Sequence, residues 1–167
     1  MAVHYRSKGF VLEKKDLRET DQLFTVFTEE FGKINVLGRS IRKINSKLRA
    51  GIDLCYFSEI EFIQGKNYKT LTDAIVLQKF SDMTIWKMAG AMNVLIRGQE
   101  KDEKIWNLLN DVFCRWSESP EDGKFVYYCF LRSLLDAMGY KMELGAGEFY
   151  SEACSFGLST ILKKVIS

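Results

Sequence analysis

The sequence predicts an α+β protein in which a small five-stranded β-barrel precedes an α-helical region. Apolar residues recur at the short, alternating spacing of strands up to about residue 80, and at helical spacing beyond it. Five short strands are too few for a large open sandwich, whereas closing them into a barrel removes the exposed sheet edges. We therefore place a barrel domain in residues 1–80 and a small helical domain in residues 81–167.

Five segments of the first half have the composition of strands, and turn signals separate them. In residues 55–64, Ile60 and Phe62 alternate with Glu59 and Glu61, as a half-buried strand requires. The last segment is also compatible with a helix that begins near residue 74. A five-stranded barrel of this size is an OB-fold, and an SH3-like barrel is the alternative that the pattern leaves open. The predicted strands are residues 5–14, 21–28, 33–39, 55–64 and 71–77.

The second half has the patterns of helices. Apolar residues recur at helical spacing in residues 85–96 and 105–116. Residues 119–122 combine a capping serine, a proline and two acids, and so predict the start of a third helix that ends at Gly139. A last short helix is predicted in residues 158–165, after a glycine-containing break. We expect these helices to form the second domain.

The charge is unevenly distributed, although the formal net charge is only +2. Residues 1–80 carry 14 Lys and Arg against 10 Asp and Glu, whereas residues 81–167 carry 10 against 12. The first half therefore favours an anionic partner. No apolar run approaches the roughly 18 residues of a membrane span, and residues 1–14 lack a signal-peptide pattern. We expect a cytoplasmic protein with no membrane partner and with free thiols.

The sequence offers little for catalysis or for a cofactor. His4 is the one histidine, and nothing marks a serine or cysteine partner for it. The four cysteines form no C-x-x-C pair, which leaves a zinc site without support. Ser40 and Lys43 match the S-x-x-K pattern without its companion motifs, and the glycines at 145 and 147 do not make a phosphate loop. We predict no catalytic residue, no cofactor and no metal.

A basic segment is the feature that points to a function. Residues 31–52 contain six cations and no Asp or Glu. Clustered cations displace counterions from a phosphate backbone, so binding would fall steeply with salt; the alternative is a solvated loop that keeps the protein soluble. Tyr68, in a predicted turn beside Lys66 and Lys69, is the aromatic residue best placed for exposure and base stacking. The predicted nucleic-acid-binding residues are Lys33, Arg39, Arg42, Lys43, Lys47 and Arg49.

Several stretches of the first half resemble the RecO family of bacterial recombination mediators. They are YRSKGFVL at 5–12, ETDQLFTVFT at 19–28, FGKI at 31–34, GR at 38–39, RKxxSKLR at 42–49 and FSEIEF at 57–62. The second half resembles the family more loosely, chiefly in LLDAMGY at 134–140. The resemblance implies an N-terminal OB-fold, a C-terminal helical domain and a non-enzymatic role in DNA repair.

The resemblance also implies partners. RecO family proteins bind single- and double-stranded DNA, anneal complementary strands and, with RecR, help to load RecA onto strands coated by the single-strand-binding protein. By matched position, the six basic residues named above would contribute to DNA binding, and the protein would be associated with the nucleoid. The alternative from another functional class is a protein-interaction adaptor on the same scaffold, without DNA binding.

This sequence departs from the family in its second half. Many members carry a four-cysteine zinc module after the segment that matches Gly139, but residues 141–149 contain no cysteine and Cys154 stands alone. We expect the zinc module to be absent and the helical domain to be reduced. In the family the helical domain binds the acidic C-terminal tail of the single-strand-binding protein. The candidate cations for that tail are Arg97, Lys101, Lys104, Arg115 and Arg132.

Overall fold

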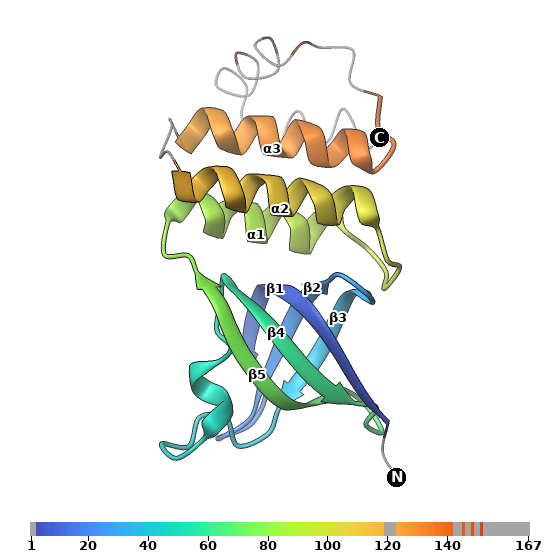
Figure 1. Ribbon diagram of the computed structural model, residues 1–167. Helices are drawn as coiled ribbons and strands as arrows, with labels where there is room; N and C mark the ends of the chain where they lie inside the picture. The colour runs from blue at the N-terminus through green and yellow to red at the C-terminus, as the bar shows by residue number, and fades with distance from the viewer. Residues whose placement is uncertain (1–2, 119–122, 142–144, 146–147, 149–150, 152–167) are drawn as a thin grey trace. The chain divides into compact units, whose positions relative to one another are not determined.

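The computed structural model describes residues 3–118, 123–141, 145, 148 and 151, except the side chains of 114–118. The chain divides into two compact units, Met1–Asp102 and Glu103–Ser167. The first unit contains five strands, one α-helix and a short 3₁₀ helix (Figure 1). Helix α1 (Met83–Leu95), which the sequence pattern groups with the helical domain, belongs to this first unit. The domain boundary at residue 80 remains a prediction.

The five strands form a closed barrel in the order β1-β2-β3-β5-β4. Neighbouring strands pair antiparallel, except for the short parallel pairing of β3 with β5. This barrel followed by helices confirms the α+β, OB-fold prediction, and residues 74–77 belong to a strand, not to a helix. The strands are β1 (His4–Asp16), β2 (Gln22–Thr28), β3 (Gly32–Gly38), β4 (Tyr56–Ile63) and β5 (Lys69–Lys79).

Strand β1 closes the barrel because it pairs with two neighbours. Its first part pairs with β4 from His4 to Phe10, and its second part pairs with β2 as far as Asp16. The register with β2 shifts between Val11 and Glu13. Such an irregularity bends a strand and increases its twist, which lets one long strand complete the ring.

The barrel interior is apolar, and the alternation predicted from the sequence supplies it. Glu59 and Glu61 lie half-exposed on the outer face of β4, while Ile60 and Phe62 between them are buried. The core also includes a residue pair from outside the strands, Ile41 and Ile52. The residues at the centre of the core are Val11, Phe24, Val26, Ile34, Val36, Ile60, Phe62 and Leu71.

The connection from β3 to β4, residues 39–55, is fixed onto the barrel. It contains a single short 3₁₀ helix, η1 (Lys47–Ala50). At Gly51 the backbone lies so close to β5 that an added Cβ would stand 1.8 Å from the carbonyl oxygen of Ala74, so this position requires glycine. The buried Ser58 hydroxyl donates to the Gly51 carbonyl oxygen at 2.7 Å. The end of the predicted basic segment is therefore packed and hydrogen-bonded against the barrel.

Helix α1 packs against β1 at one end of the barrel (Figure 1). The Asp82 carboxylate caps it by accepting a hydrogen bond from the Thr84 amide at 2.6 Å. The residues that helical spacing predicts to face inward are buried, and Trp86 on another face is exposed. The buried residues of α1 are Ile85, Met88, Ala89, Met92 and Leu95.

The second unit contains α2 (Glu103–Glu118) and α3 (Gly123–Ala137), which pack on each other. Gly139 has a φ of +89° and follows the end of α3, as predicted from its position after the apolar pattern. The predicted start signal at 119–122 and the predicted last helix at 158–165 lie outside the described residues. Across the part of the chain that the structure describes, no helix is both long and apolar enough to cross a membrane.

Candidate nucleic-acid interface

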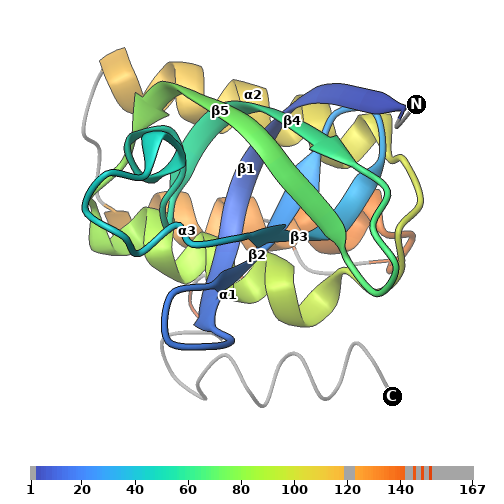
Figure 2. The same ribbon diagram turned by 90° about the horizontal axis from the view of Figure 1, so that it is seen from below.

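Three connections rim the end of the barrel that lies away from α1 (Figure 2). They are the β1–β2 connection (17–21), the start of the β3–β4 connection (39–55) and the β4–β5 connection (64–68). Strand direction explains this arrangement, because β1 and β3 end where β4 turns into β5. Residues that are far apart in the sequence are thereby brought to one rim.

The three connections enclose an open cavity of about 410 Å³. Arg18, Arg39 and Lys66 line it, one from each connection, and all three side chains are exposed. None of the three has a carboxylate within ion-pair distance among the described residues. Tyr68 lies beside them with 38 % of its surface exposed, as its sequence context predicts. Cations and an exposed ring in one cavity suit a ligand that has both phosphates and bases.

The Asp21 carboxylate links two of the connections at this rim. Asp21 also lines the cavity, and its Oδ1 accepts a hydrogen bond from the Ser40 amide at 2.7 Å. Ser40 has a φ of +52°, in the left-handed region that non-glycine residues seldom adopt. The Arg42 amide, two residues further, donates to the Thr20 carbonyl oxygen at 3.1 Å. These two bonds tie the β3–β4 connection to the β1–β2 connection and thus place Arg39.

The other predicted cations of the β3–β4 connection lie outside this cavity. Arg42 and Arg49 line a second cavity of about 290 Å³. Arg42 lies 3.4 Å from an Asp16 carboxylate oxygen. Lys43 and Lys47 are exposed, and no acidic partner within ion-pair distance is found for them in the described part of the chain. The connection therefore continues the positive surface beyond the first cavity.

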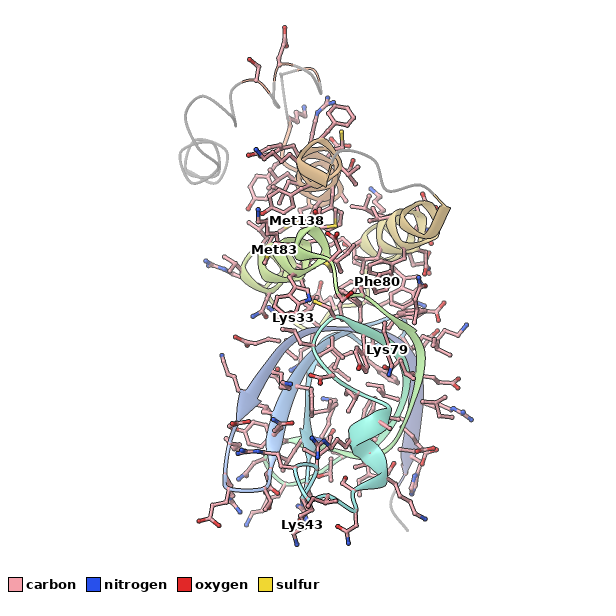
Figure 3. All side chains as sticks on the ribbon, turned by 90° about the vertical axis from the view of Figure 1, so that its left-hand side faces the viewer. Lys33, Lys43, Lys79, Phe80, Met83 and Met138 are labelled. Carbon is pink, nitrogen blue, oxygen red and sulfur yellow. The ribbon has the colours of Figure 1, made fainter. Side chains whose placement is uncertain are left out.

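Lys33 is separated from the other five predicted residues. Its Nζ donates to the carbonyl oxygens of Asn93 at 2.7 Å and Ile96 at 2.6 Å, at the C-terminal end of α1. Burial lowers the pKa of its ammonium group, and the nearby Glu13 carboxylate partly offsets this. Figure 3 shows Lys33 and Lys43 at opposite ends of the barrel. In the basic segment, the Lys33 side chain thus binds the C-terminal end of α1.

Arg18 and Lys66 are the cations of the cavity that the charge pattern did not reveal. Arg18 stands between Asp16 and Glu19, so no run of one sign marks it. Lys66 draws attention only as a neighbour of Tyr68. The signal available in the sequence is positional, since both are cations in turns between predicted strands, and turns of a small barrel converge at its ends.

His4 and Cys55, whose side chains could in principle take part in catalysis, have contacts that explain them structurally. His4 begins β1, is exposed, and places Nδ1 2.6 Å from a Glu61 carboxylate oxygen. Hydrogen bonds from His4 and Thr72 lower the pKa of Glu61. Burial raises the pKa of the Cys55 thiol to about 12, which makes it a poor nucleophile. No group of three or more metal-ligating side chains is found among the residues that the structure describes.

The two helices of the second unit enclose a cavity of about 260 Å³. Its described lining is apolar and polar, and Asp111 is the one charged residue among the described lining residues. The lining includes none of the cations proposed for an acidic tail, and the Arg115 side chain lies outside the described residues. The described lining therefore offers no cation to an anionic peptide.

The barrel topology and the cationic rim define a protein of the OB-fold class, whose members bind oligonucleotides or oligosaccharides at this surface. Residues 1–80 match the family described as Recombination protein O N terminal. These first 80 residues belong to the RecO N-terminal domain family.

Named relatives extend this finding to much of the chain. The DNA repair protein RecO of Heliobacterium modesticaldum is 31 % identical over 145 residues, which cover 84 % of this chain and 53 % of the relative. The RecO protein of Desulfitobacterium hafniense is 26 % identical over 149 residues, covering 84 % and 54 %. That of Clostridium acetobutylicum is 34 % identical over 79 residues, covering 47 % and 32 %. The chain spans about half the length of the Heliobacterium and Desulfitobacterium relatives.

Proposed function

We propose that this protein binds DNA at the open end of its barrel and acts in DNA repair and recombination. The observation that carries the proposal is the cavity where Arg18, Arg39 and Lys66 surround the exposed ring of Tyr68. These three cations have no carboxylate within ion-pair distance among the described residues, so each would gain a phosphate contact at little cost in broken ion pairs. The match of residues 1–80 to the RecO N-terminal family, and the similarity to named DNA repair proteins, support the same ligand.

The mechanism would be electrostatic and steric, not chemical. The three cations of the cavity hold phosphates of one strand, while a base stacks on the Tyr68 ring. Lys43, Lys47 and Arg49 continue the positive surface and neutralise phosphates of a second strand. Two strands held in this way repel each other less, so complementary bases pair more readily. Annealing of single strands and binding of duplex DNA would follow from one surface.

The further steps rest on family resemblance. We propose that the protein acts with RecR and the single-strand-binding protein in loading RecA. The acidic C-terminal tail of the single-strand-binding protein would have to bind outside the α2–α3 cavity, because Asp111 there would repel it. Among the described candidate cations, Arg97, Lys101 and Lys104 are exposed, and Lys101 lies 3.6 Å from a Glu30 carboxylate oxygen.

The test is fluorescence anisotropy with a labelled single strand at several salt concentrations, followed by addition of the complementary strand. We expect salt-sensitive binding and faster annealing. Replacing Arg39, Arg42 and Lys43 together by alanine should weaken binding and flatten the slope of log affinity against log salt, by about 0.7 per lost phosphate contact on single strands.

A matched control removes the same charge elsewhere. Lys8, Lys79 and Lys87 are exposed and line neither cationic cavity. Their combined replacement by alanine should leave the salt slope close to that of the unchanged protein. Equal losses in the two triple variants would show that only net charge matters and would remove the site from the proposal. Absence of salt-dependent binding to any oligonucleotide would favour the adaptor alternative.

A further inference from the structure

Ile44 is an apolar side chain held almost completely in water. It is 96 % exposed, and the next most exposed of the large apolar side chains described, Val94, reaches 71 %. It stands in the β3–β4 connection, directly after Arg42 and Lys43. A single exposed apolar residue is ordinary on a protein surface. The support and the surroundings of Ile44 are not ordinary.

Hydrogen bonds hold the turn that carries Ile44, and its side chain is exposed there. Ile44 lies in a tight turn in which the Ser46 amide donates to the Lys43 carbonyl oxygen at 3.0 Å. Ile41, just before this turn, is 1 % exposed and is part of the barrel core. The Asp21–Ser40 and Arg42–Thr20 hydrogen bonds described above hold the segment of the β3–β4 connection just before this turn. The tip is therefore pre-organised, which lowers the entropy lost when it inserts into a partner.

Cations flank Ile44 on both sides along the chain, and one of them, Arg42, pairs with the Asp16 carboxylate. Residues 31–52 contain no acid, and Lys43, Lys47 and Arg49 have no carboxylate within ion-pair distance among the described residues. A partner that covers Ile44 must therefore combine negative charge with apolar surface a few ångströms behind it. Nucleic acid has this arrangement, with phosphates outside and base faces within. A lipid surface is usually bound by a continuous apolar helix face, and this turn presents one side chain.

We propose that Ile44 is a wedge that inserts between neighbouring bases of the DNA bound by the surrounding cations. This rests on the proposed function and adds to it a second mode of contact, in which the protein unstacks a base step. A base freed from its neighbour is open to pairing with a complementary strand. The β3–β4 connection would thus both hold the phosphates and expose the bases.

The experiment uses single strands and duplexes that carry 2-aminopurine, whose fluorescence rises when the base is unstacked. The full chain is titrated into each, beside an Ile44→Ser variant. We expect a rise with the unchanged protein and loss of most of it in the variant. The variant should bind about tenfold more weakly, as for loss of one buried aliphatic side chain. Its salt slope should not change, because no cation is removed.

Ile75→Ser is the matched control, since Ile75 is exposed on β5 and lines neither cationic cavity. It should behave as the unchanged protein. An equal fluorescence rise with and without Ile44 would overturn the wedge while leaving DNA binding intact. If the unchanged protein fails to bind at low salt, the proposed function itself is wrong. Binding to phosphatidylglycerol vesicles that requires Ile44, without any fluorescence rise on DNA, would assign the tip to a lipid surface and also overturn the wedge.

Discussion

The Nζ atom of Lys33 on β3 donates a hydrogen bond of 2.6 Å to the carbonyl oxygen of Ile96, which caps the end of helix α1. The same ammonium group also donates to the carbonyl oxygen of Asn93. It thus satisfies two of the backbone carbonyls that the end of a helix leaves without an intrahelical partner. A positive charge is favourable there because the helix dipole is negative at its C-terminus. One residue of the barrel thus holds the helix that follows it.

Replacing Lys33 by methionine should destabilise the protein and spare DNA binding. Methionine keeps the apolar stem and removes the ammonium donor, which we expect to cost about 1–2 kcal/mol in the free energy of unfolding for a half-exposed group. Urea unfolding measures this loss. Anisotropy on the same samples should show an unchanged salt slope. A slope reduced as in the Arg39, Arg42 and Lys43 variant would place Lys33 in the DNA site after all.

Tyr68 should contribute to DNA binding through its ring and not through its hydroxyl group. Tyr68→Ala is expected to weaken single-strand binding by roughly 1–3 kcal/mol, the usual contribution of one stacked base. Tyr68→Phe keeps the ring and should bind normally. The two variants are compared by anisotropy at one salt concentration. Equal weakening in both would point to the hydroxyl, and no weakening in either would exclude stacking at this position.

Asp21 should have two separable roles. Asp21→Asn keeps an oxygen that accepts the bond from the Ser40 amide but removes the negative charge from the cavity, so single-strand affinity should rise by up to about 1 kcal/mol. Asp21→Ala also loses the bond and should reduce stability by about 1 kcal/mol. Urea unfolding and anisotropy separate the two effects. A fall in affinity for Asp21→Asn would mean that the carboxylate itself contacts the ligand.

Cys55 should resist alkylation in the folded protein. It is fully buried, and burial with the nearby Asp53 charge raises the pKa of its thiol to about 12. The thiolate is the form that reacts with iodoacetamide. Because the pKa is about 12, almost no thiolate is present at pH 8. Iodoacetamide treatment followed by peptide mass spectrometry should find Cys55 unmodified in buffer and modified in urea. The half-buried Cys129 serves as the internal comparison, and equal modification of both in buffer would contradict the expectation.

The local order of the sequence determined most of the fold. Alternation such as that of Ile60 and Phe62 with Glu59 and Glu61 is a property of neighbouring residues, so all five strands could be predicted. The same holds for the apolar stripes of α1 and α2 and for Gly139 at the end of α3. The basic segment, too, is visible because its cations follow one another along the chain.

The cavity was decided by the tertiary structure, because it depends on which connections the barrel brings together. Arg18 and Lys66 are 48 positions apart and meet Arg39 only after the strands close into a ring. Lys33 belongs to the basic segment by position, yet it caps a helix 60 residues away because β3 carries it to the opposite end of the barrel. Sequence order gives the number of cations, whereas strand direction decides which of them share a surface.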